Sequence, residues 1–361
     1  MKMPEISIVM PVYNCEDYLE DTLDCVFNQT FGDFELICVD DGSTDSSLDI
    51  LKEFADNDFR LKIISQENKG SGAARNRGLI ESSGEYLFFI DSDDYIVPDF
   101  LDVCHKNISK TDCDFLMFQI ASIRDGLMDG DVMFTPYHMN EKFIFNYEIN
   151  KTSVINSYFA PWSKFYKKEF LEKYNILFDE DLPYEDVLFH IKSMINASKI
   201  LFIPECLYYY RIDSQNSLSS DSTTHIKIFD VVENVRKYLN DEGILDDFEM
   251  EFESFKTQQV IWHLNLPIDE EYFLKTKSYL KDVDCQNNTI MKNHFKEMYE
   301  IIYNCPSIEI CQRNLKMARL ENENRMLTNK RDYHKRKKEE IESSRSWRLT
   351  QSLRNLGRKL R

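Results

Sequence analysis

A chain of 361 residues with 42% hydrophobic side chains has the length for two or three domains, and no apolar stretch approaches the ~18 residues that cross a bilayer. The nine cysteines are an odd number without Cys-x-x-Cys spacing, so neither a disulfide framework nor a zinc site is expected. The net charge of -19 argues against nucleic acid as the main partner.

The first 90 residues alternate between apolar runs and stretches with helical spacing of apolar or small residues. Four apolar runs are predicted strands: residues 5–10, 34–39, 61–65 and 86–90. Pro11 is expected to end the first strand, because it cannot continue a ladder, and Asn14 or Asp17 to cap the helix that follows. Alternating strands and helices predict a parallel sheet whose right-handed crossovers bring the loops after the strands to one edge.

Beyond Asp94 the pattern is looser. Further strands are predicted over residues 113–120, 200–203 and 207–212, with helices after residue 186 and from residue 225 onward. Residues 124–151 have no clear period and receive no assignment. We therefore expect an α/β domain over residues 1–220, a helical domain over 221–312 and a basic helical or coiled-coil tail over 313–361.

The charge is unevenly distributed along the chain. Residues 311–361 carry 16 Lys and Arg against 6 Asp and Glu, whereas residues 1–310 carry 28 against 57. A basic segment with apolar residues such as Trp347 predicts contact with an anionic membrane surface; a solvated, frayed tail is the alternative. Because the chain starts without a signal-peptide pattern, we expect a cytoplasmic protein, peripheral on the inner face of the plasma membrane.

Carboxylates gather directly after the predicted strands. Asp91, Asp93 and Asp94 repel one another, so they suit a divalent cation, Mn²⁺ or Mg²⁺, held against a phosphorylated ligand. The glycine-rich segment 70–78 opens a helix, whose free N–H groups favour a phosphate, and Arg75 adds a positive charge there. A carboxylate at a distant position, Asp186, could act as a general base. Such a set suits the displacement of a nucleoside diphosphate.

Taken in order, five segments resemble the motifs of inverting family 2 glycosyltransferases with the GT-A fold, of the type that builds bacterial and archaeal cell-surface glycans. These segments are residues 9–14, 39–45, 72–78, 91–94 and 184–186. The resemblance covers about residues 5–217 and is specific as an ordered set. It implies a GT-A domain, Rossmann-like with a mainly parallel sheet, followed by the helical domain and the basic tail.

The resemblance also implies roles for individual residues. On the donor side, Pro11, Tyr13 and Asn14 line the nucleoside pocket, Asp41 bonds the base, Asn68 and Arg75 face the nucleotide, Asp91 and Ser92 face the ribose, and Asp93 holds the metal. Asp186 matches the family's catalytic base, and Glu185 orients a sugar hydroxyl or the base itself.

Four further residues are candidates with a structural alternative. Trp162 could stack on a sugar, although an aromatic ring beside a proline is equally suited to packing. His190 shares a helical face with Asp186 and could reach the metal or the base, but a structural histidine is the favoured interpretation. Arg211 resembles an arginine of the family's closing segment that approaches the diphosphate or the acceptor, and Lys164 has the same standing.

The resemblance implies transfer of a hexose or N-acetylhexosamine from a UDP-sugar to a hydroxyl of a cell-surface glycan or polyprenyl-linked acceptor. Asp186 would act as the base of a single displacement assisted by Mn²⁺ or Mg²⁺. Two alternatives stay open: a metal-dependent nucleotidyltransferase, which would release pyrophosphate, and a non-catalytic scaffold subunit of a glycan-assembly complex. A homo-oligomer is compatible with all three.

Overall fold

The structure of the protein, a computed structural model, describes residues 3–124, 127–128, 141–212, 225–264, 269–285, 287–291, 293–318 and five positions between 320 and 331. The chain forms two compact units, residues 1–260 with 286–291 and residues 261–285 with 292–361. The domain limits expected at residues 220 and 312 stay a prediction. The basic segment around Trp347 lies outside the described residues.

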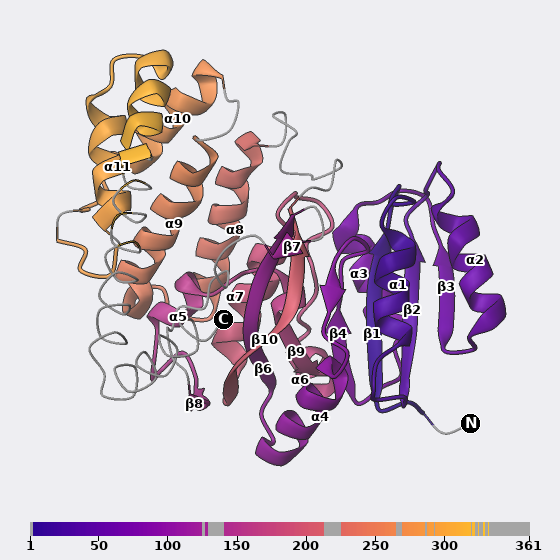
Figure 1. The fold of residues 1–361 in the computed structure, drawn as a ribbon. Helices are drawn as coiled ribbons and strands as arrows, with labels where there is room; N and C mark the ends of the chain where they lie inside the picture. Colours follow the sequence, from indigo (N-terminus) through magenta and orange to yellow (C-terminus); the bar gives the residue numbers. More distant parts are fainter. Residues whose placement is uncertain are drawn as a thin grey trace, which may run out of the picture. The chain divides into compact units, whose positions relative to one another are not determined.

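A ten-stranded mixed sheet forms the centre of the first unit (Figure 1). Its strands are β1 (Ile6–Val12), β2 (Phe34–Asp40), β3 (Leu61–Ser65), β4 (Tyr86–Phe89), β5 (Tyr95–Ile96), β6 (Phe115–Arg124), β7 (Leu127–Met128), β8 (Phe143–Phe145), β9 (Lys164–Lys167) and β10 (Ile200–Arg211). The order is β3-β2-β1-β4-β9-β6-β10-β5, with β7 beside β6 and β8 beside β10. The long pairings, β1 with β2 and β4, β2 with β3, and β6 with β10, are parallel. This confirms the predicted mixed, mainly parallel sheet.

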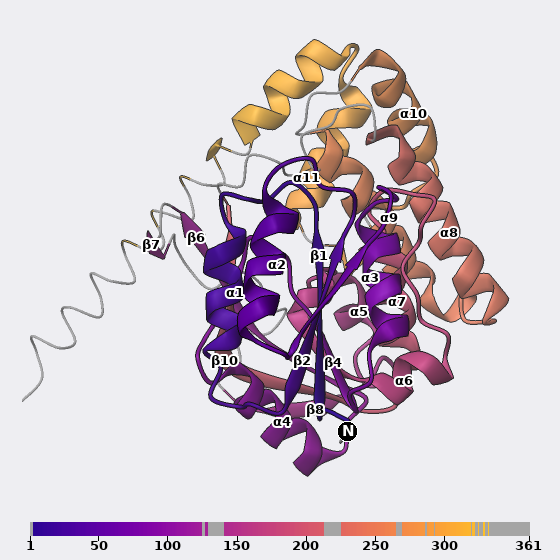
Figure 2. The same cartoon turned by 90° about the vertical axis from the view of Figure 1, so that its right-hand side faces the viewer.

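Helices cover both faces of the β3-β2-β1-β4 part of the sheet. The helices are α1 (Leu19–Phe27), α2 (Ser47–Asn57), α3 (Ser71–Glu81), α4 (Phe100–Thr111), α5 (Thr152–Asn156), α6 (Lys168–Lys173), α7 (Asp186–Asn196), α8 (Ile228–Asp241), α9 (Glu249–His263), α10 (Glu270–Leu280) and α11 (Asn293–Asn304). Figure 2 shows α1 and α2 on one face of this part and α3 on the other. The helices after residue 225 agree with the prediction for that part of the chain.

The small residues of α3 allow it to approach β1 closely. A Cβ on Gly78 would lie 2.3 Å from a methyl carbon of Val9, so any larger residue would push helix and strand apart. On the opposite face, alternate residues of β1 such as Ile8 and Met10 pack in one cluster with Leu23 of α1. The sheet is therefore apolar on both faces, as the unbroken apolar runs predict.

Two local predictions are wrong. β1 continues through Pro11 to Val12, with Pro11 in register with Val39 of β2. The N–H of Ile90 bonds the carbonyl of Val9, and Pro11 is the next residue of β1 to face that side, beyond the end of β4. Its missing N–H therefore costs no ladder hydrogen bond. The residue before α1 is Tyr18, which makes no side-chain cap, so neither Asn14 nor Asp17 caps the helix.

The two strands predicted over residues 200–212 are a single strand, β10. Its pairing with β6 shifts register between Phe202 and Cys206 and again between Cys206 and Tyr208. This irregularity lets the strand include Pro204, which a regular ladder would exclude.

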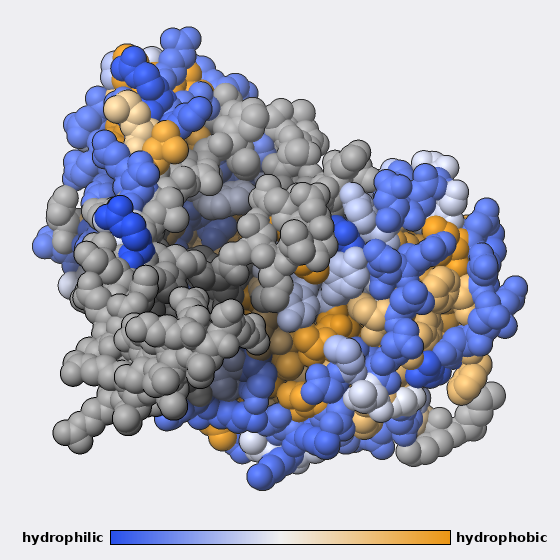
Figure 3. Space-filling view, in the orientation of Figure 1, coloured by the Kyte–Doolittle hydropathy of each residue, from blue (hydrophilic) through white to orange (hydrophobic). Residues whose placement is uncertain are grey.

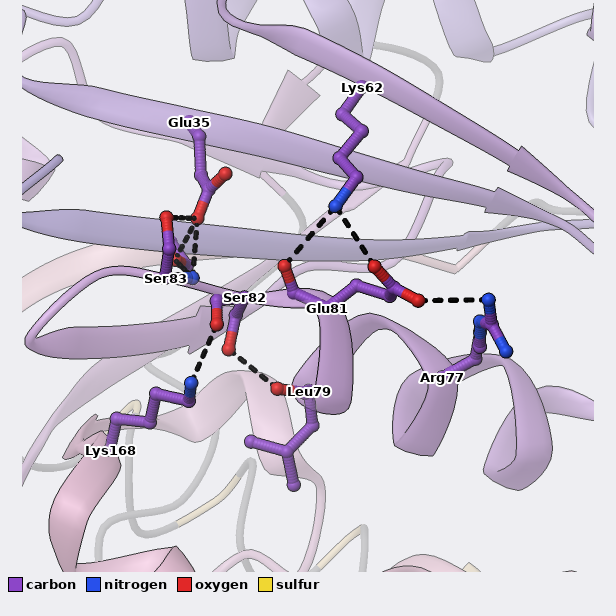
Figure 4. Close-up of polar contacts among 9 residues, drawn as sticks. Glu35, Lys62, Arg77, Leu79, Glu81, Ser82, Ser83 and Lys168 are labelled. Atoms are coloured by element: carbon purple, nitrogen blue, oxygen red, sulfur yellow. Dashed lines mark hydrogen bonds and ion pairs between the residues drawn. The ribbon is translucent and has the colours of Figure 1, made fainter. Parts of the chain in front are cut away.

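The turn between α3 and β4 is fastened at the amino end of the sheet, away from the loops that follow the strands (Figure 4). The Lys62 ammonium lies 3.1 Å from a carboxylate oxygen of Glu81, and Lys168 donates to the Ser82 carbonyl at 2.6 Å. These contacts hold the start of β4 against β3 and α6.

In the second unit, Asp269 caps α10 by accepting a hydrogen bond from the Tyr272 N–H at 2.8 Å. Lys277 of α10 donates to the Cys305 carbonyl, which follows α11, at 2.8 Å.

Across the parts of the chain that the structure describes, no helix combines the length and apolar character needed to cross a membrane. On the face drawn in Figure 3, hydrophilic residues cover most of the described surface and apolar residues form smaller areas between them.

Candidate functional site

The loops after β1, β2, β3 and β4 lie at one edge of the sheet, because these four strands run parallel. Hydrogen bonds connect them in pairs. Asn14 after β1 meets Thr44 after β2, Asp41 after β2 meets the loop after β3, and Arg75 in α3 meets Asp91 after β4. The predicted convergence of the motifs at the carboxyl edge is confirmed.

Asn14 shapes the first loop of this edge. Its φ angle of 46° lies in the left-handed region, which asparagine tolerates better than most residues. The side-chain oxygen accepts a hydrogen bond from the Thr44 N–H at 2.8 Å, and the Asn14 N–H donates to the Ser43 hydroxyl at 3.2 Å. Tyr13 beside it is 49% exposed, so its ring is available to a ligand.

Asp41 is used by the chain itself. One carboxylate oxygen accepts hydrogen bonds from the Gln66 amide at 2.8 Å and the Lys69 N–H at 2.9 Å, and the other accepts from the Gly70 N–H at 2.8 Å. The side chain is buried, and the Asn68 side chain that it helps to present is exposed. Asp41 thus fastens the loop between β3 and α3, a role that the sequence alone did not indicate.

Arg75 connects the end of β4 to the start of α7. One terminal nitrogen donates to Glu185 at 2.6 Å and the other to Asp91 at 2.8 Å, while the residue as a whole is 6% exposed. Burial alone would lower the pKa of Arg75, but the charges of Asp91 and Glu185 outweigh it and raise the pKa above its usual value. The guanidinium therefore faces two carboxylates of the chain, whereas the resemblance assigned it to the nucleotide.

The two adjacent acids Glu185 and Asp186 are held differently. Glu185 accepts hydrogen bonds from Arg75 and from the Ser71 hydroxyl. Asp186 begins α7, and among the described residues no other side chain donates a hydrogen bond to its carboxylate. Burial, with the charge of Glu185, raises the pKa of Asp186 to about 6, and the charges of Arg75 and Lys164 oppose that rise. A carboxylate to which no other described side chain donates a hydrogen bond, with a pKa near neutrality, is suited to accept a proton.

Asp94 is a structural acid that the sequence did not single out from its neighbours. It is completely buried and accepts hydrogen bonds from the Tyr208 hydroxyl at 2.5 Å and the Arg211 N–H at 2.8 Å. Burial, followed by the charges of Asp93 and Asp91, raises its pKa well above the usual range. Asp94 thus joins the turn after β4 to β10.

The acids of this edge could hold a divalent cation only together with the phosphates of a bound ligand. Among the described residues, no group of three or more His, Cys, Asp or Glu side chains could hold a metal ion by itself. Asp91 is paired with Arg75, and Asp94 is completely buried. Asp93, which the resemblance assigns to the metal, could supply a hard oxygen. Mg²⁺ is commonly held by one or two carboxylates together with substrate phosphates, and Asp93 fits that arrangement.

Arg211 supports the backbone of the acidic turn. Its Nε donates to the Asp93 carbonyl at 2.8 Å, and its guanidinium lies 4.7 Å from the ring centres of both Tyr18 and Tyr95. A carboxylate oxygen of Asp21 lies 3.7 Å from it. The side chain is thereby fixed beside Asp93 in contact with the chain.

The other three candidates are buried packing residues. Trp162 is 3% exposed and stacks on Tyr208 with ring centres 4.6 Å apart, which is the packing alternative and leaves no face for a sugar. His190 is completely buried with Nε2 2.8 Å from the Val154 carbonyl, in keeping with the favoured structural role. Lys164 is also completely buried, so its amine does not reach a diphosphate or an acceptor directly.

Comparisons with known proteins identify the family of the chain. The model of the family described as Glycosyl transferase family 2 matches residues 7–174. The glycosyltransferase GlyA of Streptococcus pneumoniae is 35% identical over 216 residues, which are 58% of this chain and 30% of GlyA. The glycosyltransferase GlyG of the same species is 30% identical over 218 residues, 57% of this chain and 70% of GlyG.

Among solved structures, residues 1–349 of S. aureus TarS, in complex with UDP-GlcNAc, superpose with a TM-score of 0.65 at 21% identity. The match covers 88% of this chain and 92% of the TarS chain, and shows the GT-A fold expected from the motifs. With the order of the motifs, the sheet and the relatives in agreement, this chain belongs to glycosyl transferase family 2.

Proposed function

We propose that the protein is an inverting glycosyltransferase that transfers a sugar from a UDP-sugar to a hydroxyl of a cell-surface glycan or lipid-linked acceptor. One observation carries this proposal: Asp186, whose carboxylate receives no hydrogen bond from another described side chain, stands at the same edge as the Asp91–Asp94 turn and is connected to it through Glu185 and Arg75. The UDP-GlcNAc bound to TarS supports the donor class. The acceptor class is supported by a poly(ribitol-phosphate) beta-glucosyltransferase of Bacillus spizizenii, which is 33% identical over 213 residues.

In the proposed reaction, the acceptor oxygen attacks the anomeric carbon of the donor from the face opposite the diphosphate. The new carbon–oxygen bond forms as the bond to the diphosphate breaks, and Asp186 accepts the proton of the acceptor hydroxyl. UDP leaves with the bonding electrons, and the anomeric configuration inverts. Bound beside Asp93, a divalent cation would supply positive charge to neutralise the leaving diphosphate.

The chain's main contribution in this proposal is positioning. Arg75 bonds the acid that faces the ribose, Asp91, and the acid that precedes the base, Glu185, so that donor and base are held at a fixed separation. Effective placement of the reacting atoms supplies a large share of catalysis in transfers of this kind. The exposed Tyr13 and Asn68 flank the proposed nucleoside pocket.

We also propose that the protein works at the inner face of the plasma membrane. The support is electrostatic: residues 311–361 carry a net charge of +10, which favours an anionic lipid surface. Acceptors linked to lipid would be presented at that surface.

The test is thermal unfolding of the purified protein with a panel of nucleotides and nucleotide sugars, in Mn²⁺, Mg²⁺ or a chelator. UDP and one UDP-sugar should stabilise the protein only with metal, by about 2.7 kcal/mol at ~100 times the Kd. Asp93→Ala should remove the effect. NMR of the product made from that donor should show inversion at the anomeric carbon. Absence of stabilisation by every nucleotide, or a product of retained configuration, would contradict the proposal.

A further inference from the structure

We infer that His225 is a positioning residue of the proposed base. Through a hydrogen bond to Tyr184, which stands two residues before Asp186, it holds the turn that leads into the base. The inference rests on the proposed function, because it takes Asp186 as the base. It assigns His225 a part in the reaction that requires no contact with either substrate.

Tyr184 has a backbone conformation that tyrosine rarely adopts. Its φ angle of 60° lies in the left-handed region, where the Cβ of an L-residue comes too close to the following carbonyl oxygen. In the described part of the chain, the other non-glycine residues with positive φ are Asn14, Asp112 and Asn175, whose short polar side chains tolerate this region. A strained tyrosine persists only where its surroundings hold it, and such residues cluster at active sites.

The strained turn leads directly into the two acids. The Tyr184 carbonyl accepts a hydrogen bond from the Val187 N–H at 3.1 Å, which closes a turn that contains Glu185 and Asp186. Glu185 already has helical backbone angles and makes no side-chain cap for α7. The direction in which α7 starts is therefore set by the backbone of Tyr184, and a change in its φ angle would move both acids.

A distant part of the chain holds the Tyr184 side chain. Its hydroxyl lies 3.1 Å from Nδ1 of His225, which is 41 residues later in the sequence, and a hydrogen bond joins the two. His225 begins the short helical turn His225–Lys227 before α8 and is only 1% exposed. Because a closely packed imidazole cannot follow a tyrosine that moves, the contact fixes the tyrosine.

The start of the same loop is fixed separately, by α3. The Asn76 amide donates to the Phe178 carbonyl at 3.0 Å, and its oxygen accepts from the Phe178 N–H at 2.9 Å. A Cβ on Gly72 would lie 2.5 Å from the Asp179 carbonyl and 3.1 Å from Cβ of Glu185, so the loop lies directly against this helix. With its start fixed, the loop can change its course mainly near Tyr184.

The position of Asp186 depends on the two residues before it, because no other described side chain donates a hydrogen bond to its carboxylate. Glu185 is held by Arg75 at 2.6 Å, and Tyr184 is held by His225 at 3.1 Å. Arg75 connects the base to the donor side of the site. His225 connects it to the segment that leads into α8, and this second connection sets the path of the backbone.

The test measures kcat per folded molecule and UDP affinity for Tyr184→Phe and His225→Leu. Tyr184→Phe keeps the ring and removes the hydroxyl. In each variant kcat should fall about tenfold, since a small misplacement of a reacting group is costly, while UDP affinity, followed by thermal unfolding, should not change. A purely structural hydrogen bond would lower the thermal midpoint and leave kcat per folded molecule unchanged. Unchanged kcat in either variant, or an equal loss of UDP affinity, would overturn the inference.

Two further variants separate the hydrogen bond from packing. The double variant Tyr184→Phe/His225→Leu should lose no more than about tenfold, because both substitutions remove the same bond. A loss of about a hundredfold would show independent effects and overturn the inference. His225→Asn offers a polar atom near the position of Nδ1, serves if His225→Leu does not fold, and should keep most of the wild-type kcat. A loss equal to that of His225→Leu would contradict the role of the hydrogen bond.

The matched control is Tyr86→Phe. It removes the hydroxyl of a buried tyrosine at the start of β4, which lies 3.3 Å from the Ser109 hydroxyl at the opposite end of the sheet from the site. This variant should keep the wild-type kcat. A loss equal to that of Tyr184→Phe would overturn the inference.

A second readout distinguishes failure of this inference from failure of the proposed function. The imidazole of His225 can be followed by NMR of nitrogen-labelled histidine, with its signals assigned by their absence in His225→Asn. Tyr184→Phe should shift the Nδ1 signal whether or not a transfer product is found. An unchanged signal would overturn the role of His225 even in an active transferase. Transfer retained by Asp186→Asn would instead remove Asp186 as the base.

Discussion

Two acids of the same sheet edge, Asp41 and Asp186, show opposite ways of holding a carboxylate. Asp41 is buried and accepts three hydrogen bonds from the loop after β3, so its carboxylate is occupied in stabilising that loop. Asp186 receives none from another side chain of the described residues and is governed by the charges around it. An acid saturated with donors is part of the scaffold, whereas an acid without donors is free to change its protonation state.

Replacement of Asp186 by Asn should give the largest effect, a loss of turnover. Asp186→Asn removes the proposed proton acceptor and should lower kcat by about a thousandfold, the middle of the range for general bases, with unchanged UDP affinity. The measurement is product formation under saturating donor. Asp181→Asn, in the exposed loop before α7, is the matched control and should keep wild-type turnover. Equal losses in both variants would remove the distinction.

Removal of Arg75, the cation that connects Asp91 to Glu185, should lower the stability of the protein. Arg75→Met leaves Asp91 and Glu185 as poorly solvated carboxylates without their partner, and the free energy of unfolding should fall by about 3 kcal/mol. Urea unfolding measures the change. Arg77→Met, which breaks an exposed pair with Glu81 on the same helix, should cost less than about 0.5 kcal/mol. A similar cost for both would mean that Arg75 is not the connection between the sides.

Replacement of Asp41 by Asn should lower the stability of the protein. In Asp41→Asn, one of the donors from Gln66, Lys69 or Gly70 would face an amide NH₂ group, and unfolding free energy should fall by about 2 kcal/mol. The thermal midpoint should fall accordingly, while kcat per folded molecule should change far less than in Asp186→Asn. An unaffected thermal midpoint would show that the loop does not depend on this carboxylate.

The smallest expected effect is a pH dependence of stability that Asp186 alone imposes. Its pKa is raised in the folded state from 3.8 to about 6, so between these values the folded protein holds a proton that the unfolded chain has released. Stability from this group is therefore present below about pH 4 and falls as pH rises to about 6. Asp186→Asn should lack that fall. Parallel stability curves for variant and wild type would contradict the raised pKa.

The sequence predicted the frame of the site well because the frame depends on local patterns. Apolar runs and small-residue helices identified the strands and α3, and the parallel order placed their loops at one edge. Local patterns predict irregular backbone less well. Pro11 lies within β1 because the neighbouring strand β4 ends before it, and Pro204 lies within β10 at a shift of register.

The sequence could not predict how each acid is used, because the partners come from distant segments. Arg75 and Glu185 are separated by 110 residues, and Tyr208 and Asp94 by 114. Which aspartate of the Asp91–Asp94 turn faces inward is decided by that turn's packing against β10. Sequence spacing treats the three acids of the turn alike, whereas in the structure Asp91 pairs with Arg75 and Asp94 is buried against β10.

The double contact of Arg75 also constrains the order in which the enzyme can mature. Its partner Asp91 follows 16 residues later, but Glu185 is synthesised 110 residues later. A nascent chain can therefore form the first four strands and the Asp91 pair while the second acid is still inside the ribosome. Only when α7 docks does Arg75 gain its other carboxylate. The two carboxylates that Arg75 connects are thus brought to their final separation in one late folding step.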